Sequence, residues 1–483
     1  MGYLPQFSII CCLLIGIKAA VNDRYYPRYH LAPPQGWMND PNGFSVFNGE
    51  YHLFYQYNPL SSLEPGIAHW GHAVSEDLFH WEHLPIAMYP NNTYDSSGVF
   101  SGSALIEDDI MYLFYTGNVN HPNEQPNHEQ RQALAESTDG IHVTKYENNP
   151  IIMADDRQPN IRDPKVWKHG SKYYMVLGNS FENDTLGRAL LYSSDDKINW
   201  EEISVLHESD GSLGFMYECP DFFKLNGKYV LLFSPQGIEP QGDKYRNLYQ
   251  TGYIVGNFNY ETNEFHPITS FQELDHGHDF YATQTIKDNR GRRLLVAWFD
   301  MWERDYPQAQ DGFTGQMTIV RELHLTRDNK LIQEPVSEVK AVRANRVRRG
   351  KGRVGDVVTF EDKAGEIDIL GDSSEDLEVV IEGEGSTVTI SYDASNGTVT
   401  LDRGGDDGVR RTEWKPSGSI LKWTIYVDAS SIELFCGKGE VTFSSRFFPD
   451  GEVSARISSG CPDKFAVYNL KRTVQSPEDE TER

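Results

Sequence analysis

Five short apolar runs, each eight residues long and rich in aromatic and branched side chains, recur along the first two thirds of the chain. They occupy residues 51–58, 111–118, 173–180, 229–236 and 294–301, and their starts lie 56 to 65 residues apart. Their lengths and residue types are typical of β-strands. Because no sustained helical period accompanies them, the repeat predicts five strand-rich units, which is the organisation of a five-bladed β-propeller.

A polar pattern with the same period supports this repeat. Ser75-Glu76-Asp77, Ser137-Thr138-Asp139 and Ser194-Asp195-Asp196 each follow one of the first three runs by about 20 to 26 residues, and the first and third lead to Trp81 and Trp200. Ser and Asp are turn residues because their side chains bond to the nearby backbone. The same turn is therefore expected in successive units.

The repeat stops near residue 335, and a different pattern follows. Residues 377–382, 387–392 and 424–435 alternate between apolar and polar side chains, as strands with one buried face do. The sequence thus predicts an all-β fold, a five-bladed β-propeller followed by a C-terminal β-sandwich. The expected division is a signal peptide at 1–20, the propeller at 21–335, the sandwich at 336–472 and a disordered acidic tail at 473–483.

The first twenty residues predict secretion. Residues 9–17 form an apolar run that is long enough for a signal-peptide core and too short to span a membrane comfortably. Glycosylation sequons at Asn91, Asn183 and Asn396 are compatible with a eukaryotic secretory route. We therefore expect a secreted, extracellular glycoprotein that is cleaved near Ala20.

Charge narrows the range of partners. The formal net charge of −27 would repel nucleic acid and anionic membranes, so neither is expected as a partner. The cluster His276-Gly277-His278-Asp279 lacks the spacing of a metal site, and no metal or organic cofactor is predicted. The basic residues 343–353 are interpreted as a solvated linker between the two domains. The oligomeric state stays open.

Three acids stand at matching places in the repeat. Asp40 precedes its run by 11 residues, Asp163 by 10 and Glu218 by 11, so all three are expected to occupy the same position in blades one, three and four. Equivalent positions in a radially symmetric fold converge on one axis, which predicts one cavity lined by three carboxylates. Clustered carboxylates push their pKa values apart, and a proton donor beside an ionised carboxylate is what glycoside hydrolysis requires.

The segments around these acids resemble glycoside hydrolase family 32, the invertases and β-fructofuranosidases. The motifs are WMNDPNG at residues 37–43, RDP at 162–164 and YECPD at 217–221. Further segments similar to this family lie at 54–59, 69–75, 99–103 and 274–282, so the resemblance covers nearly the whole chain after the leader. It implies the same architecture, a propeller followed by a sandwich.

The resemblance also implies a function and its residues. It points to a secreted, retaining β-fructofuranosidase whose small-molecule substrate is sucrose or a related fructoside. By this likeness Asp40 is expected to be the nucleophile, Glu218 the general acid/base and Asp163 the transition-state stabiliser that binds fructosyl hydroxyls. The sugar pocket is expected to be lined by Asn39, Gln56, Trp70, Phe100, Ser101, Arg162, Tyr281 and Trp298.

Several alternatives stay open at this point. A fructosyltransferase of the same fold would use the same acids, a five-bladed arabinanase-like enzyme would also use two Asp and one Glu, and a fructan-binding lectin would be expected to have lost an acid. The segment Glu64-Pro65-Gly66 stands where many relatives carry a Trp before the Gly, so the rim of the pocket is expected to differ. Preference between sucrose and inulin or levan is left undecided.

The cysteines are few. Two of the five lie in the leader, which leaves Cys219, Cys436 and Cys461. Secretion would permit a disulfide between Cys436 and Cys461, because both fall in the sandwich, and we leave that pairing as an open possibility. Cys219 is expected to be a free, buried thiol that fills space.

Overall fold

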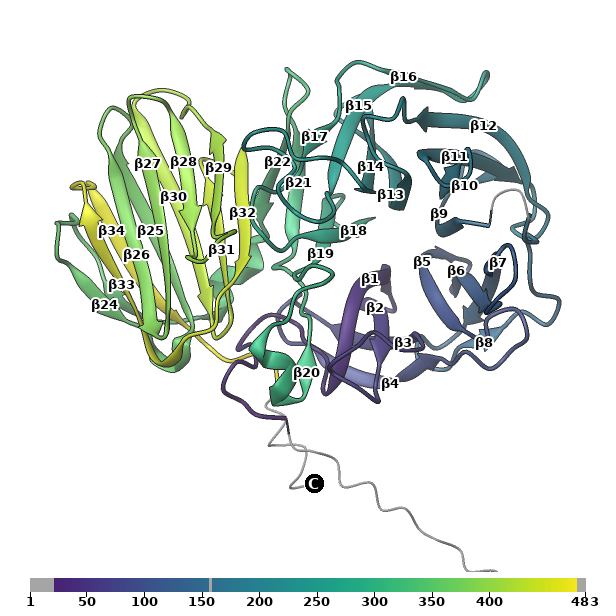
Figure 1. Cartoon of the computed structure of the whole chain (residues 1–483), viewed down its shortest axis with the longest axis horizontal. Helices are drawn as coiled ribbons and strands as arrows, with labels where there is room; N and C mark the ends of the chain where they lie inside the picture. The colour runs from purple at the N-terminus through teal and green to yellow at the C-terminus, as the bar shows by residue number, and fades with distance from the viewer. Residues whose placement is uncertain (1–20, 156–158, 476–483) are drawn as a thin grey trace, which may run out of the picture.

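The computed structural model describes residues 21–155 and 159–475. Seven sheets account for its strands, and the fold class predicted from the sequence is confirmed. Five sheets surround one axis as the blades of a propeller, and two longer sheets pack face to face as a β-sandwich beside it (Figure 1). The predicted signal peptide lies outside the described residues.

Each blade is an antiparallel sheet whose innermost strand faces the axis. Blade 1 comprises β1 (Gly36–Phe47), β2 (Glu50–Asn58), β3 (His69–Ser75) and β4 (Glu82–Met88). Blade 2 comprises β5 (Gly98–Glu107), β6 (Ile110–Asn120), β7 (His128–Ser137) and β8 (Thr144–Lys145). Blade 3 comprises β9 (Ile161–His169), β10 (Lys172–Phe181), β11 (Leu186–Ser194) and β12 (Glu201–Glu208).

Blades 4 and 5 complete the ring. Blade 4 comprises β13 (Met216–Leu225), β14 (Lys228–Gln236), β15 (Gly252–Asn259) and β16 (Glu264–Pro267), with β17 (Gln272–Glu273) paired to β15. Blade 5 comprises β18 (Tyr281–Lys287), β19 (Arg293–Trp298), β21 (Arg321–Leu325) and β22 (Leu331–Pro335). Short 3₁₀ turns occur at η1 (Pro307–Asp311), η2 (Ser337–Val342) and η3 (Glu361–Lys363).

The five apolar runs found in the sequence are the second strands of the five blades, β2, β6, β10, β14 and β19. They are apolar on both faces because each blade packs between two neighbours. On β14, Leu231 joins the cluster shared with blade 3, whereas the next residue, Leu232, joins the cluster shared with blade 5. Successive side chains of a strand point to opposite faces, so a strand buried on both sides reads as a continuous apolar run.

The repeated Ser-x-Asp pattern is a turn at the outer side of the blades. In blade 1, the Ser75 Oγ accepts hydrogen bonds from the backbone N–H groups of Asp77 and Leu78 at 3.2 and 2.8 Å. Ser137 and Ser194 bond in the same way to backbone N–H groups three residues further on. The Ser side chain thus accepts from backbone N–H groups just after the third strand, which explains why the pattern recurs in blades 1, 2 and 3.

The sandwich consists of two six-stranded sheets. The first follows the order β23 (Arg343–Arg348), β34 (Lys464–Leu470), β25 (Gly365–Asp372), β30 (Ile420–Asp428), β31 (Ser431–Cys436) and β32 (Val441–Arg446). The second follows the order β24 (Val357–Thr359), β33 (Asp450–Ser459), β26 (Leu377–Glu384), β27 (Ser386–Asp393), β28 (Thr398–Asp402) and β29 (Val409–Glu413).

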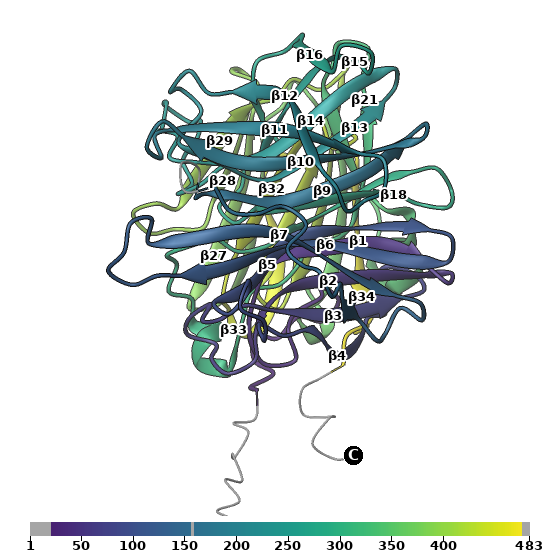
Figure 2. The same cartoon turned by 90° about the vertical axis from the view of Figure 1, so that its right-hand side faces the viewer.

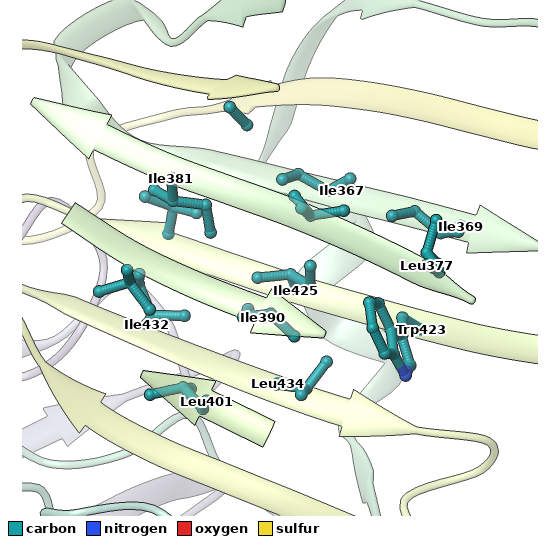
Figure 3. Close-up of a cluster of buried hydrophobic side chains, with 14 of the residues drawn as sticks. Ile367, Ile369, Leu377, Ile381, Ile390, Leu401, Trp423, Ile425, Ile432 and Leu434 are labelled. Atoms are coloured by element: carbon teal, nitrogen blue, oxygen red, sulfur yellow. The ribbon is translucent and has the colours of Figure 1, made fainter. Parts of the chain in front are cut away.

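The sandwich core is formed by every second residue of these strands. Ile367 and Ile369 of one sheet face Ile390 of the other, and Trp423 and Ile425 fill the space between the layers (Figure 3). All five side chains are fully buried. The alternation seen in residues 377–392 of the sequence therefore marks the inward faces of a sandwich, as predicted.

The chain crosses between the domains just after residue 335. The last propeller strand ends at Pro335, and β23 begins at Arg343. The predicted solvated linker is in part a strand, because β23 pairs with β34 and Arg343 forms an ion pair with Glu366.

At the C-terminal end of the sandwich, Thr473 is buried and its backbone N–H donates to the Arg28 carbonyl at 2.8 Å. Residues 473–475 thus belong to the folded body, and the predicted tail begins too early.

The segment 274–279, which contains the His276-Gly277-His278-Asp279 cluster, connects the propeller to the sandwich. The backbone N–H of His276 donates to the Thr442 carbonyl of β32 at 2.8 Å, and that of Asp279 donates to the Ser444 carbonyl at 3.1 Å. Gly277 is required here because a Cβ at this position would lie 2.0 Å from the Ser444 oxygen. In Figure 2, viewed from the propeller side, the blade strands cross in front of the sandwich strands.

The seam between the first and last blades is closed by side chains and by backbone hydrogen bonds, among them Met317 N–H to the Leu31 carbonyl at 2.8 Å and Gly36 N–H to the Gly312 carbonyl at 2.9 Å. Within the described residues, the strand pairing at the seam is the short parallel bridge between β20 (Phe313–Thr314) and β1. On the sandwich, Glu433 contacts both sides of the seam. Its Oε1 lies 2.9 Å from the His30 Nε2, just before blade 1, and its Oε2 lies 2.6 Å from the Arg321 Nη2 of blade 5.

The three cysteines of the described chain are free thiols, so the disulfide left open between Cys436 and Cys461 is not formed in the structure. Cys436 points into the sandwich core, whereas Cys461 is exposed on the turn after β33. Cys219 is buried and free, as expected. No described helix is long and apolar enough to cross a membrane.

Candidate active site

Every innermost strand of the propeller has a β-bulge at the same level. The regular pairing with the second strand is interrupted at Ser101 in blade 2 and at two residues in each of the other blades, Asn39 and Asp40, Asp163 and Pro164, Cys219 and Pro220, and Ala282 and Thr283. Asp163, Cys219 and Ala282 have positive φ values of 66°, 46° and 52°. A bulge breaks the strict alternation of side chains, so neighbouring residues can both face the axis. Local strain of this kind is concentrated at functional sites.

The three acids do not share one position, so the predicted register is wrong. Counted from the last paired residue before each bulge, Asp40 is the second residue, Asp163 is the first and Glu218 is the paired residue itself. Glu218 pairs with Ser234 immediately before the bulge of blade 4, as Arg162 pairs with Gly178 immediately before the bulge of blade 3. The true equivalent of Asp163 in blade 4 is therefore Cys219. The acids still converge, because the bulge lets both positions open onto the axis.

One cavity of about 390 Å³ lies at this level of the axis. It is lined by the three acids and by Asn39, Gln56, Pro65, Gly66, Ala68, Ser97, Phe100, Ser101, Asn118, Asn120, His128, Gln130, Asn160, Arg162 and Trp302. The structure thus brings together the three predicted catalytic acids and five of the eight predicted sugar-binding residues, Asn39, Gln56, Phe100, Ser101 and Arg162.

Asp40 is held by three donors. Its Oδ2 accepts a hydrogen bond from the Ser101 hydroxyl at 2.7 Å and one from the Cys219 thiol at 3.4 Å, and its Oδ1 accepts from the Asn39 amide at 3.1 Å. Burial, and next the charge of Glu218, raise the pKa of Asp40, whereas these three hydrogen bonds oppose that shift. The donors fix the direction of the carboxylate and stabilise its ionised form.

Asp163 lies in surroundings that disfavour its charged form. Burial, followed by the charge of Glu218, raises the pKa of Asp163 to about 7, although the Arg162 guanidinium acts in the opposite direction. The backbone N–H of Cys219 donates to its Oδ2 at 2.9 Å. Burial and the neighbouring carboxylates also raise the pKa of the Cys219 thiol well above its ordinary value, so this group remains a neutral S–H donor.

Glu218 is surrounded by hydrogen-bond donors. Its Oε1 accepts from the Nε and Nη2 of Arg162 at 2.9 and 2.8 Å. Its Oε2 accepts from the Gln236 amide at 2.8 Å and from the Tyr281 hydroxyl at 2.6 Å. Both oxygens are therefore engaged, and a proton can bind to Oε2 only if one of these two donors changes its orientation.

Two amide side chains, Gln130 and Asn160, accept hydrogen bonds from the Arg162 nitrogen that does not bind Glu218. The Nη1 of Arg162 donates to the Gln130 Oε1 at 3.3 Å and to the Asn160 Oδ1 at 3.2 Å. Since arginine is only a donor, the orientation of both amides is fixed. The Asn160 Oδ1 also lies 2.9 Å from the His128 Nε2, so this nitrogen must carry a proton.

Three predicted sugar-binding residues lie behind the wall of the cavity. Trp70 and Trp298 are fully buried, and neither lines the cavity. The Trp70 indole donates to the Phe100 carbonyl at 3.0 Å, and Trp298 packs against Trp302 with ring centroids 5.0 Å apart. Both support residues that do line it. Tyr281 is also buried, but its hydroxyl reaches Glu218 directly.

The sequence reasoning missed Gln236, Trp302 and the amide wall formed by Asn118, Gln130 and Asn160. A signal for some of them was present, because the second and fourth apolar runs end in Asn118 and Gln236 at the end of the strand that faces the cavity. Among the residues the structure describes, no group of three or more His, Cys, Asp or Glu side chains could hold a metal ion.

Family models match most of the chain. The N-terminal domain of glycosyl hydrolases family 32 matches residues 30–335, and the C-terminal domain of the same family matches residues 338–466. The first match covers the propeller with its cavity, and the second covers the sandwich.

Individual relatives agree with these models. A sucrose-6-phosphate hydrolase of Zymomonas mobilis is 38% identical over 462 residues, covering 90% of this chain and 89% of the relative. A raffinose invertase of Escherichia coli is 37% identical over 459 residues, covering 92% and 94%.

Solved structures extend the likeness to the whole fold. A GH32 beta-fructofuranosidase of Bombyx mori superposes with a TM-score of 0.88 and is 44% identical, covering 95% of this chain and 96% of the other. A variant of that enzyme has been solved in complex with sucrose. With both family domains matched and relatives well above 30% identity over most of the chain, the protein belongs to glycoside hydrolase family 32, a family of enzymes that hydrolyse sucrose.

Proposed function

We propose that the protein is a secreted, retaining β-fructofuranosidase that releases fructose from sucrose and related terminal β-fructosides. The observation that carries the proposal is the convergence of Asp40, Asp163 and Glu218 on one cavity, each with a different set of partners. A retaining glycosidase needs one carboxylate to attack the anomeric carbon and a second carboxyl group to protonate the leaving oxygen.

In the proposed reaction, Asp40 attacks the fructosyl C2 and forms a covalent intermediate while Glu218 protonates the departing glycosidic oxygen. Glu218 then removes a proton from water, which attacks C2 and releases fructose. The hydrogen bonds from Ser101 and Asn39 hold Asp40 ionised for the attack.

Asp163 has a separate proposed role. Fructosyl hydroxyls that donate to its carboxyl would favour the ionised form and so oppose the rise in its pKa that burial and the charge of Glu218 cause.

The charge of the cavity favours a neutral sugar over a phosphorylated one. Of the described residues that line it, none is lysine, and Arg162 is the single arginine, with its Nε and Nη2 already bonded to Glu218. Recognition of a phosphate usually requires free arginine or lysine donors. Sucrose-6-phosphate hydrolase is the name of several relatives, but the described cavity supports unphosphorylated sucrose as the substrate of this chain.

Secretion and glycosylation belong to the same proposal. The predicted leader supports export, and the three sequon asparagines, Asn91, Asn183 and Asn396, are all exposed and could accept a glycan. The mass of protein isolated from a secreting eukaryotic host, before and after enzymatic removal of N-glycans, tests both points. An N-terminus upstream of Ala20 in the secreted protein would contradict the proposed cleavage.

Product analysis tests the activity. Purified protein incubated with sucrose, raffinose, inulin, sucrose-6-phosphate and maltose should release fructose from sucrose and raffinose, act poorly on sucrose-6-phosphate and leave maltose intact. Chromatography of the products separates hydrolysis from fructosyl transfer, since transfer yields oligosaccharides longer than the substrate. Release of glucose from maltose at a comparable rate would contradict the assignment.

A further inference from the structure

Two segments of blade 5 that border the active site are anchored on the sandwich. The first precedes β18 and ends at Asp279, two residues before Tyr281. The second follows β19 and runs from Phe299 to Trp302. Each of them reaches the sandwich through a buried charged side chain. The first leads to Tyr281, which contacts Glu218, and the second ends at Trp302, which lines the cavity.

The anchor of the first segment is the buried Asp279. Its Oδ2 accepts hydrogen bonds from the Arg403 Nη1 and from the backbone N–H of Arg446, both at 2.7 Å, and its Oδ1 accepts one from the Tyr306 hydroxyl. Arg403 follows β28, and Arg446 ends β32. The sandwich thus supplies, through Arg403, the positive charge that balances the buried Asp279 carboxylate. The Arg403 side chain is largely buried as well, with 14% of it exposed.

The anchored segment leads directly to the acid. Tyr281 begins β18 and donates its hydroxyl to the Glu218 Oε2 at 2.6 Å. The next residue, Ala282, lies in the bulge of blade 5 and has a positive φ of 52°. The backbone here is not held by hydrogen bonds of the regular strand pairing. Contacts on either side of the bulge must hold Tyr281 in place, and Asp279 supplies one of them.

The second segment is anchored by the side chain of Arg446. Its Nη1 donates to the Phe299 carbonyl at 3.1 Å and lies 3.4 Å from the Asp300 Oδ2. Two residues further on, Trp302 lines the cavity and stacks on Trp37, with ring centroids 6.1 Å apart and planes inclined by 22°. The same sandwich strand therefore fixes part of the cavity wall as well.

We infer that the β-sandwich takes part in acid catalysis, with Arg403 as a positioning residue that sets the Tyr281–Glu218 hydrogen bond through Asp279. The inference rests on the role proposed for Glu218. Oε1 of Glu218 already accepts two hydrogen bonds from Arg162, and Tyr281 donates to Oε2. The placement of Tyr281 therefore affects how readily Glu218 can carry a proton to the leaving group. Arg403 does not line the cavity and contacts none of the three acids there.

The effect should depend on the leaving group. Sucrose needs a proton on its departing oxygen, whereas an aryl β-fructofuranoside with an acidic phenol needs little help. A variant that is merely less well folded loses both activities by the same factor, because both are proportional to the folded enzyme. A selective loss on sucrose therefore reports the placement of the acid and not the amount of folded protein.

The test compares Arg403→Gln with two controls in the full-length protein. Arg403→Lys keeps the positive charge, and Arg456→Gln removes an arginine from another ion pair of the sandwich, with Glu382. We expect Arg403→Gln to lower kcat on sucrose about tenfold and kcat on the aryl fructoside less than threefold. Arg403→Lys should recover sucrose turnover to within threefold of the wild type, and Arg456→Gln should leave both rates unchanged.

Two results would overturn the inference. Equal losses on both substrates, or no loss on either, would mean that Arg403 has no special relation to the acid. A crystal structure of Arg403→Gln that retains the Tyr281–Glu218 hydrogen bond at its present length would do so independently of any activity. Failure of the wild type to hydrolyse sucrose would instead contradict the proposed function, and the crystal structure would still decide the role of Arg403.

Discussion

Replacing Glu218 by Gln should damage both the activity and the stability of the protein, and the two effects can be separated. The amide that replaces the carboxylate has one acceptor oxygen, whereas four donors from Arg162, Gln236 and Tyr281 converge on the native group. If the oxygen stays on Arg162, the new NH₂ group faces the Gln236 amide and the Tyr281 hydroxyl. The hydroxyl can rotate to accept, but the Gln236 amide must turn over.

The magnitudes follow from these contacts. Loss of acid/base help typically costs a factor of 10² to 10⁴ in rate, about 3 to 5 kcal/mol of activation free energy. Breaking the buried pair with Arg162, whose side chain is 12% exposed, leaves a charge without its partner. Full removal of one member of a buried pair costs about 3 to 5 kcal/mol, and since the amide oxygen still accepts from Arg162, we expect about 2 kcal/mol here.

Asp40→Asn is the matched variant. Its partners are the Ser101 hydroxyl and the Cys219 thiol, which can rotate, and the Asn39 amide. We therefore expect a loss of stability below about 1 kcal/mol. Turnover should be abolished on every substrate, because no fructosyl-enzyme can form.

The assay measures kcat on sucrose and on an aryl β-fructofuranoside for both variants, together with urea unfolding followed by circular dichroism at the same pH. Glu218→Gln should recover activity on the aryl substrate, and Asp40→Asn should not. Rescue of Asp40→Asn but not of Glu218→Gln would reverse the assigned roles. A Glu218→Gln variant as stable as the wild type would refute the account of the Arg162 pair.

Three further predictions concern stability. In Asp163→Asn, stability relative to the wild type should increase by about 4 kcal/mol between pH 4 and pH 8. The folded wild type loses stability over this range because its raised pKa of about 7 lies above that of the unfolded chain, and urea titrations at several pH values check this. In the wild type, burial holds the pKa of His72 well below 6.5, so below pH 6.5 the unfolded chain binds a proton there that the folded chain does not, and stability falls. This fall should become smaller in His72→Gln. A decrease as steep as in the wild type would contradict the reasoning. Gly277→Ala should destabilise the protein by about 1 to 3 kcal/mol through the clash with Ser444, whereas Gly371→Ala, whose Cβ would meet nothing closer than 3.8 Å, should cost no more than about 1 kcal/mol; equal melting temperatures would refute the steric argument.

Much of the fold could be predicted from the sequence because the physical signal is local and repeated. The second strand of each blade is buried on both faces, so residues 173–180 and 229–236 read as continuous apolar runs, and their spacing gives the number of blades. The sandwich strands alternate between apolar and polar residues because one face of each sheet is buried and the other is exposed to solvent. Both patterns can be recognised in the sequence without knowing which distant segments are in contact.

The details of the site depend on geometry that no local pattern contains. The bulges at Asp163 and Cys219 shift the register by one residue, so counting along the chain placed Glu218 in the wrong position while still bringing it to the right cavity. Trp70 and Trp298 were expected at the sugar from the family resemblance, but their burial behind the wall is a property of the packed blades. The tail boundary failed for the same reason, since the backbone of Thr473 is held by the distant Arg28.

The seam of the propeller has a consequence for how the protein comes apart. Blade 1 is built entirely from the beginning of the described chain and blade 5 from residues far along it, so no shared sheet ties the ring together beyond the bridge between β20 and β1. The carboxylate of Glu433 links His30 to Arg321 across that joint. Heat or denaturant that loosens the sandwich therefore also releases the joint, and we expect the two domains to melt as one cooperative unit, with loss of activity coinciding with the unfolding of a domain that holds none of the catalytic acids.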